Sequence, residues 1–209
     1  MRPYLLSALI LWVVAAAIGF AVEAGHLRSF DVALSLGLGG PARAAGWPVA
    51  VLLFATVLGS AAVRLPVAAA VTLLLAVRRD WVSVRMLAAS TIGVLVGNAG
   101  LKHLVGRARP ELLPHLAVET SLSFPSGHSS NAAAVFLAIG WVLVREGYRP
   151  RIVWPLAILL VAAVGVSRVV LGVHWPTDVI AGWCVGTGWM LVCAALCSQR
   201  RRVVQPAGV

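Results

Sequence analysis

The chain has 209 residues, of which 60% are hydrophobic and only 11% are charged, and its mean hydropathy is +0.94. A soluble domain carries roughly 25% charged residues, so this composition excludes an ordinary soluble globular protein. The net charge is +10, but most of the excess basic residues lie at the ends of apolar runs, which indicates membrane topology and lipid headgroup contacts rather than nucleic-acid binding.

Apolar runs of membrane-spanning length occur at 4–22, 48–77, 82–104, 129–144, 152–170 and 178–198. The second run contains Arg64 and Pro66 near its middle and is longer than one straight crossing needs. We interpret it as one crossing kinked at Pro66, because two crossings would each be short and almost without a turn. The sequence therefore predicts an all-α fold, a six-transmembrane-helix integral membrane bundle, with residues 1–209 forming a single membrane domain.

The remaining segments are expected to be peripheral. Residues 23–47 are expected to form a loop with a short interfacial helix from Phe30 to Gly37, which the sequence Gly39-Gly40-Pro41 would end. The first apolar run lacks a clear small-residue cleavage site, so it is expected to be a span and not a cleaved signal peptide. The tail 199–209 is basic and is expected to be an unstructured cytoplasmic end.

Three polar clusters interrupt the apolar chain: KHLVGRARP at 102–110, PSGH at 125–128 and SRVVLGVHWPTD at 167–178. The first closes the third run, the second opens the fourth, and the third joins the fifth to the sixth, so all three meet at one membrane face. Ten of the seventeen Lys and Arg residues fall on the opposite side. The positive-inside rule therefore predicts that the clusters lie at the outer face of the cell membrane.

The first cluster has the chemistry of a phosphate-binding site. Lys102 and Arg109 are seven residues apart, so on a helix that Pro110 would end they project from nearly the same face. Arg offers a planar fork that suits phosphate oxygens, and Lys offers a point charge. Arg107 points elsewhere on this geometry and is expected to meet lipid headgroups or a neighbouring acid.

The second cluster stands where an apolar helix begins. Ser126 is expected to be the N-cap, and Gly127 permits a close approach to the backbone. The N–H groups and the dipole at such a helix start favour an anion. His128, at the same place, can donate a proton to a leaving oxygen.

The third cluster pairs a histidine with a carboxylate. Asp178 follows His174 by four residues and can accept a proton from one ring nitrogen, which leaves the other nitrogen as a nucleophile. The alternative is a capping aspartate beside a chance histidine, but the other two clusters argue against it. Arg168 adds a third cation where charge stabilisation dominates phosphoryl transfer.

With these three clusters the chain resembles the type 2 phosphatidic acid phosphatase superfamily of lipid phosphate phosphatases. The signature of that family is Lys-x6-Arg-Pro, Pro-Ser-Gly-His and Ser-Arg-x5-His-x3-Asp, and the segments Lys102–Pro110, Pro125–His128 and Ser167–Asp178 match it at every defining position. The related vanadium haloperoxidases share the pocket, but the six-span hydropathy favours the membrane phosphatases.

The resemblance implies a mechanism without a metal or another cofactor, and the sequence shows no ligand spacing for a metal. His174 would attack phosphorus and form a phosphohistidine, Asp178 would orient His174, and His128 would protonate the leaving group. The phosphate oxygens would be held by Lys102, Arg109 and Arg168, together with Ser126 and the backbone of Gly127.

The expected partners are membrane lipids and a lipid phosphate or diphosphate substrate. A small protein with an outward-facing site fits recycling of undecaprenyl diphosphate, which we rank first. The alternative enzyme is a glycerophospholipid phosphatase that acts on phosphatidylglycerol phosphate or phosphatidic acid. The alternative from another class is a lipid-binding or transport protein without turnover, against which the intact His174, Asp178 and His128 argue.

Overall fold

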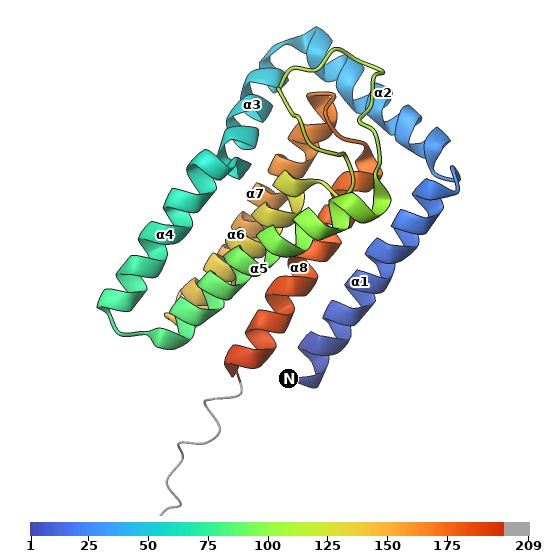
Figure 1. The fold of residues 1–209 in the computed structure, drawn as a ribbon. Helices are drawn as coiled ribbons and strands as arrows, with labels where there is room; N and C mark the ends of the chain where they lie inside the picture. The colour runs from blue at the N-terminus through green and yellow to red at the C-terminus, as the bar shows by residue number, and fades with distance from the viewer. Residues whose placement is uncertain (199–209) are drawn as a thin grey trace, which may run out of the picture.

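The structure, a computed structural model, describes residues 1–198, and all regular structure within them is helical (Figure 1). Five helices are long and apolar enough to cross a membrane: α1 (Arg2–Glu23), α5 (Trp81–Val105), α6 (Gly127–Arg145), α7 (Pro150–Val170) and α8 (Pro176–Ser198). Their bounds agree closely with five of the six predicted runs, and the predicted all-α membrane bundle is confirmed. The basic tail 199–209 lies outside the described residues.

The predicted second crossing consists of two helices, α3 (Trp47–Gly59) and α4 (Ala61–Val77). They follow one another along the flank of the bundle, as a single crossing would (Figure 1). The expected kink at Pro66 was wrong, because Pro66 lies inside α4 and the break is at Ser60. Ser60 has an extended backbone, and its hydroxyl donates to the Val57 carbonyl at 2.7 Å, which closes α3.

The expected loop 23–47 was also wrong in its main feature. Most of it is a helix, α2 (Arg28–Ala45), which runs through Gly39, Gly40 and Pro41 and meets α3 at an angle of 114°. A side chain at Gly39 would come within 2.7 Å of Leu113, so a glycine allows the loop after α5 to press against this helix. Packing of α2 across the end of the bundle therefore outweighs the helix-breaking composition (Figure 1).

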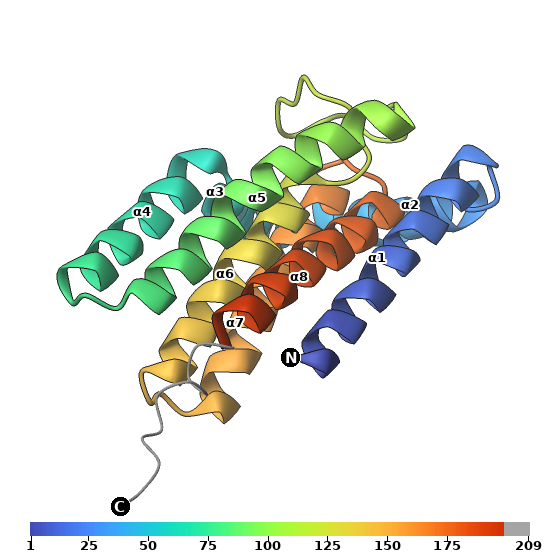
Figure 2. The same ribbon diagram turned by 60° about the horizontal axis from the view of Figure 1, so that its bottom comes forward.

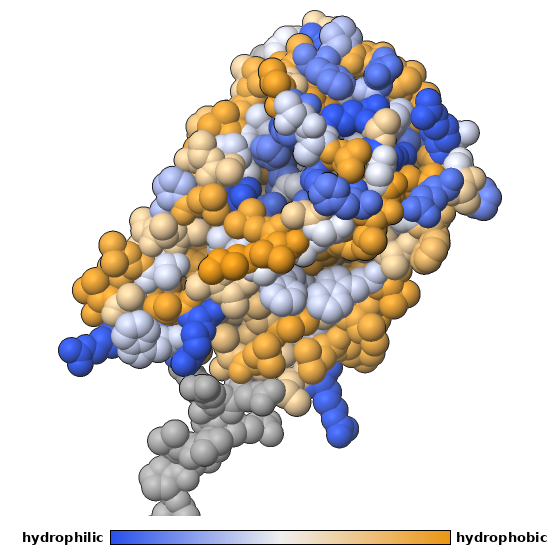
Figure 3. Space-filling model, in the orientation of Figure 1, coloured by the Kyte–Doolittle hydropathy of each residue, from blue (hydrophilic) through white to orange (hydrophobic). Residues whose placement is uncertain are grey.

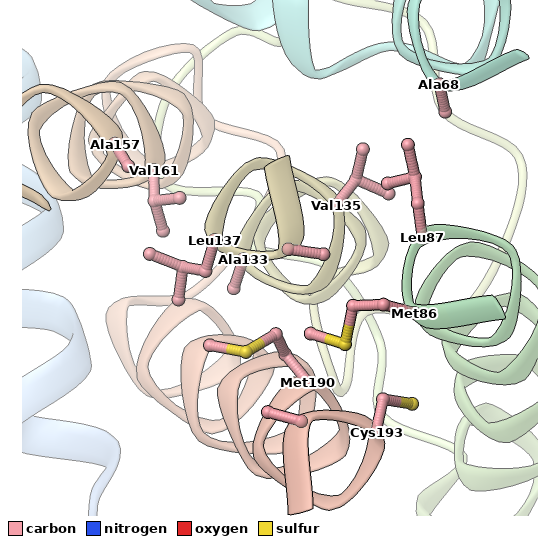
Figure 4. Close-up of a cluster of buried hydrophobic side chains, with 12 residues drawn as sticks. Ala68, Met86, Leu87, Ala133, Val135, Leu137, Ala157, Val161, Met190 and Cys193 are labelled. Atoms are coloured by element: carbon pink, nitrogen blue, oxygen red, sulfur yellow. The ribbon is translucent and has the colours of Figure 1, made fainter. Parts of the chain in front are cut away.

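Helix α6 is the centre of the bundle and packs against α5, α7 and α8. Figure 4 shows Ala133, Val135 and Leu137 of α6 surrounded by apolar side chains from its neighbours. Two glycines bring α8 against the backbone of α6: a Cβ at Gly182 would lie 2.8 Å from the Ser126 carbonyl oxygen, and one at Gly186 would lie 2.0 Å from that of Ser130. This close packing fixes the first turns of α6, which carry the PSGH motif, against α8.

The outer surface of the bundle suits lipid. Large apolar side chains such as Phe20, Val77 and Leu104 are more than two-thirds exposed, at 73%, 74% and 77%. Figure 3 shows apolar residues along the flank, with hydrophilic residues gathered at the end that holds α2 and the loop before α6. Figures 1 and 2 place the α7–α8 turn at that same end, so all three polar clusters meet there, as parity predicted.

Candidate active site

The first cluster leaves its helix earlier than expected. α5 ends at Val105, and Gly106 follows in the left-handed region with φ 63°. Arg109 therefore lies in the irregular segment after α5, and the predicted alignment with Lys102 on one helix face was wrong. The two cations still converge, because both bind the backbone segment 121–122: Arg109 Nε donates to the Ser121 carbonyl at 2.8 Å, and Lys102 Nζ donates to the Leu122 carbonyl.

His174 lies in the turn before α8 and is only 1% exposed. Its Nε2 lies 3.1 Å from Arg109 Nη1. A guanidinium can only donate a hydrogen bond, so Nε2 must carry the lone pair and Nδ1 the proton. Nδ1 faces the Asp178 carboxylate at 3.5 Å and the Ser123 hydroxyl at 3.4 Å. The Nε2 lone pair of His174 thus points to the Arg109 guanidinium and accepts a hydrogen bond from it.

Asp178, in the first turn of α8, is fully buried. One oxygen, Oδ2, accepts hydrogen bonds from the Ser123 hydroxyl and from the Trp175 backbone N–H at 3.0 Å. The other oxygen, Oδ1, accepts from Arg107 Nη1 at 2.6 Å. A buried carboxylate with this many donors is held in its ionised form and in one orientation.

The surroundings of His174 set its protonation state. Burial lowers the pKa of His174 to about 4, although the hydrogen bond and the charge of Asp178 act in the opposite direction. Burial also lowers the pKa of Arg109, which remains charged because its ordinary value is so high. His174 is therefore neutral at pH 7, as a nitrogen nucleophile must be.

Arg168, near the end of α7, is 1% exposed and faces the same pocket. Its Nη1 donates to the Thr56 hydroxyl of α3, and its Nη2 pairs with the carboxylate of Glu119. Glu119 also lies 3.5 Å from Arg109 Nη2 and 3.6 Å from His128 Nδ1. The Glu119 oxygens thus stand where the oxygens of an anionic ligand would meet the same three side chains.

The start of α6 has the geometry that the PSGH motif predicts. Ser126 is the N-cap, and its side chain accepts from the Ser129 N–H at 3.4 Å. Because Ser126 is fully buried and its hydroxyl also binds Ser129 Oγ at 3.0 Å, this hydroxyl contributes to capping the helix. Gly127 lies against Lys102, where a Cβ would be 3.9 Å from its Cε. The first-turn N–H groups of such a helix have no partner within the helix and are available to an anion.

The structure thus brings together every residue that the sequence nominated, listed from chain start to end: Lys102, Arg109, Ser126, Gly127, His128, Arg168, His174 and Asp178. Sequence reasoning missed Asp31, Thr56, Ser123 and Glu119, which come from α2, α3 and the loop before α6. For Asp31 and Glu119 a signal was available, because only seven acidic residues occur in the whole chain and each is therefore conspicuous. Among the described residues, no group of three or more His, Cys, Asp or Glu side chains is placed to hold a metal ion.

Comparison with known proteins identifies the family of the chain. The sequence profile of the PAP2 superfamily matches residues 82–202. A phosphatidylglycerophosphatase B of Bacillus subtilis is 40% identical over 113 residues, which are 52% of this chain and 55% of that protein. An undecaprenyl-diphosphatase of Sulfolobus acidocaldarius is 30% identical over 175 residues, which are 81% of this chain and 75% of that protein.

A solved structure is similar along almost the whole chain. The crystal structure of a transmembrane PAP2 type phosphatidylglycerolphosphate phosphatase from Bacillus subtilis superposes with a TM-score of 0.85 at 27% identity, covering 96% of this chain and 99% of that one. The chain spans about half the length of the phosphatidylglycerophosphatase B above. The profile match, the undecaprenyl-diphosphatase and this structure agree, and the chain belongs to the PAP2 superfamily.

Proposed function

We propose that this chain is an integral membrane lipid phosphatase that works through a phosphohistidine on His174. The observation that carries the proposal is the orientation of His174: its Nε2 lone pair faces Arg109, at 3.1 Å, in a pocket that Lys102 and Arg168 also line. A neutral, oriented imidazole among cations is the arrangement that phosphoryl transfer to nitrogen needs. The whole chain would act as one catalytic domain.

The reaction would proceed in two balanced steps. His174 Nε2 attacks phosphorus, an N–P bond forms, and the P–O bond to the lipid breaks while His128 gives its proton to the leaving oxygen. Water then attacks the phosphohistidine, the N–P bond breaks, and the proton lost by water returns to His128, releasing inorganic phosphate. Lys102, Arg109 and Arg168 would hold the phosphate oxygens through both steps, with the capped start of α6 at Ser126 and Gly127 as a further anion site.

An apolar cleft next to the pocket supports a lipid substrate. The cleft has a volume of about 740 Å³, its walls are α1 and α5, and α8 forms its floor. Phe124 lines the cleft next to the active site, because it directly follows Ser123, whose hydroxyl donates to Asp178. Gly97 and Gly100 line the α5 wall and have open space around them. A lipid chain in this cleft would present its headgroup to the cations.

Two substrate classes have specific support. Undecaprenyl diphosphate remains our first choice, because a polyprenyl carrier needs dephosphorylation on the outer face and because the undecaprenyl-diphosphatase relative matches along 81% of this chain. A glycerophospholipid phosphate, such as phosphatidylglycerol phosphate, is favoured by the similarity to the Bacillus subtilis phosphatidylglycerophosphatase B and to the Bacillus subtilis crystal structure. We infer no role for nucleic acid.

The outer location of the site is part of this proposal. Three motifs share one end of the bundle. The start of α1 and the ends of α4 and α6 lie at the other end (Figure 1). These ends carry Arg2, Arg78 and Arg145, as the positive-inside rule requires for a cytoplasmic side. A single cysteine introduced in 111–118 should react with an impermeant thiol reagent in intact cells that lack the native cysteines. One at 147–149 should stay protected until the membrane is opened, and the reverse pattern would place the site in the cytoplasm.

Release of inorganic phosphate from a panel of purified lipids tests the function itself. Undecaprenyl diphosphate, phosphatidylglycerol phosphate and phosphatidic acid should be compared at equal surface concentration in mixed micelles. His174→Ala should abolish phosphate release, whereas Asp178→Asn should retain weak activity because Asp178 orients and stabilises but does not react. Near-normal turnover by His174→Ala would overturn the mechanism, and a folded wild type that binds these lipids without hydrolysis would favour a binding or transport protein.

A further inference from the structure

Asp31 is a buried acid that no motif of the family contains. It lies in the first turn of α2, outside the residues that match the family profile, and is 0% exposed. Its Oδ1 accepts from the Thr177 backbone N–H at 3.0 Å, and its Oδ2 accepts from the Thr177 hydroxyl at 2.7 Å. Oδ2 also pairs with Arg107 Nη2 at 2.6 Å. These contacts tie α2 to the residue that precedes Asp178.

Arg107 connects Asp31 to the active site. While Nη2 binds Asp31, Nη1 binds Asp178 Oδ1 at 2.6 Å and the Thr177 hydroxyl at 2.8 Å. The Arg107 guanidinium also lies 5.2 Å from the ring centroid of Trp175, and the guanidinium of Arg28 lies 5.1 Å from the same ring. One planar group therefore bridges two buried carboxylates, and its orientation is fixed by hydrogen bonds and by an aromatic face.

The charges of this arrangement explain why a second acid is useful. If Arg107 paired with Asp178 alone, the pair would be neutral, and Asp178 would attract the proton on His174 Nδ1 less strongly. Asp31 shares the guanidinium, so two carboxylates and one guanidinium together carry a net charge of about −1. The negative charge that remains favours a basic His174, and in a buried site it is little screened.

We propose that Asp31 is a positioning residue for the phosphatase reaction, which acts through Arg107 to set the orientation and the effective charge of Asp178 and thereby the nucleophilicity of His174. This inference rests on the proposed function of the same site. It extends the nucleophile pair to a relay of four side chains, Asp31–Arg107–Asp178–His174, whose first member comes from the helix across the end of the bundle.

A conservative substitution separates this role from simple packing. Asp31→Asn keeps the size of the side chain and one acceptor but removes the charge. We expect kcat to fall about 10- to 100-fold, the range typical of outer partners that orient a functional histidine, with KM little changed. The control is Asp80→Asn, which weakens the partly buried ion pair with Arg145 at the opposite end of the bundle. This control should lose stability in detergent to a similar extent but keep its kcat.

A double-mutant cycle tests the charge argument. Arg107→Gln leaves two buried carboxylates without a counter-charge, which is strongly unfavourable. Adding Asp31→Asn removes one of them and restores a charge of about −1 on the group, so the double variant should be more active than Arg107→Gln alone. If Asp31 only holds α2 in place, the two losses should instead add, and that result would overturn the proposal.

Titration of His174 by NMR distinguishes failure of this inference from failure of the proposed function, since it needs no turnover. The other charged or titratable groups that act on His174 are Asp178 of α8, Arg168 of α7, Arg109 of the segment between α5 and α6, and His128 of α6. All four are unchanged in Asp31→Asn. Loss of the negative charge should lower the pKa of His174, whereas loosening of the site would raise it toward the ordinary value. An unchanged or raised pKa would refute the relay even in a protein that hydrolyses no lipid, and an inactive wild type would refute only the function.

Discussion

Replacing Glu119 with glutamine should strengthen anion binding in the active site. The carboxylate of Glu119 makes a hydrogen-bonded ion pair with Arg168 and longer contacts with Arg109 at 3.5 Å and His128 at 3.6 Å. A substrate phosphate would need the same side chains, so Glu119 must leave before the phosphate can bind. Glu119→Gln removes the competing charge and keeps the side chain's size.

The expected size of this effect follows from the number of contacts. Only the contact with Arg168 is at hydrogen-bond distance, and Glu119 is 19% exposed. One partly exposed charged pair of this kind contributes about 1 to 2 kcal/mol. Because 1.4 kcal/mol corresponds to a factor of about 10, the inhibition constant for orthovanadate should fall about 5- to 30-fold in Glu119→Gln.

Vanadate suits this assay because it is a phosphate analogue without a lipid chain, so the apolar cleft does not contribute to its affinity. The control is Glu111→Gln, an exposed acid of the same loop. It removes an equal charge from the neighbourhood of the pocket without vacating the pocket itself. Equal inhibition constants for wild type and Glu119→Gln, or a weaker constant in the variant, would show that Glu119 does not compete with the ligand.

Three further predictions concern pH, the cleft and metal ions. Burial lowers the pKa of His174 to about 4, so its neutral form persists as the pH falls through 6.5. After correction for ionisation of the substrate, the decrease of kcat/KM at acid pH that is due to His174 should therefore be centred near pH 4. A decrease centred near pH 6.5 would contradict the buried geometry. Gly97→Leu places a side chain in the cleft, so it should raise KM for a long-chain lipid far more than for a short-chain analogue. The control Gly37→Leu, at an equally open glycine of α2, should change KM for neither lipid. Equal effects of Gly97→Leu on both lipids would show that the cleft does not bind the lipid chain. Activity should persist in excess chelator, because three cations already neutralise the phosphate, and loss on chelation that a divalent ion reverses would require a metal in the mechanism.

The parts of this site that the sequence predicts are those with strong local patterns. Ser126 caps a helix because a capping residue followed by a long apolar run leaves few alternatives. The face shared by the three motifs followed from counting crossings, and it did not depend on side-chain detail. His174 and Asp178 are four residues apart at a helix start, so their contact is almost entirely a local matter.

The parts that were not predictable depend on contacts between distant segments. Gly106, in the left-handed region, ends α5 between Lys102 and Arg109, so the two residues do not share a helix. They converge because both donate to backbone carbonyls, Lys102 to that of Leu122 and Arg109 to that of Ser121. α2 forms in spite of two glycines and a proline, since its packing at the end of the bundle outweighs their weak helix preference. Asp31 reaches Thr177 across 146 positions, a pairing that no periodicity encodes.

The cleft and the catalytic centre are built from different parts of the bundle, which has an evolutionary consequence. Gly182 and Gly186 lock α8 to α6, so the chemistry depends on a contact that tolerates almost no change in residue size. In α1, by contrast, few residues are buried. The helix packs mainly on α8 and leaves the gap to α5 that forms the cleft. If the cleft holds the lipid as we propose, substitutions along α1 would alter which lipid is selected without disturbing turnover. Selection could diversify the lipids handled by such a bundle while the machinery that cleaves them stays constant.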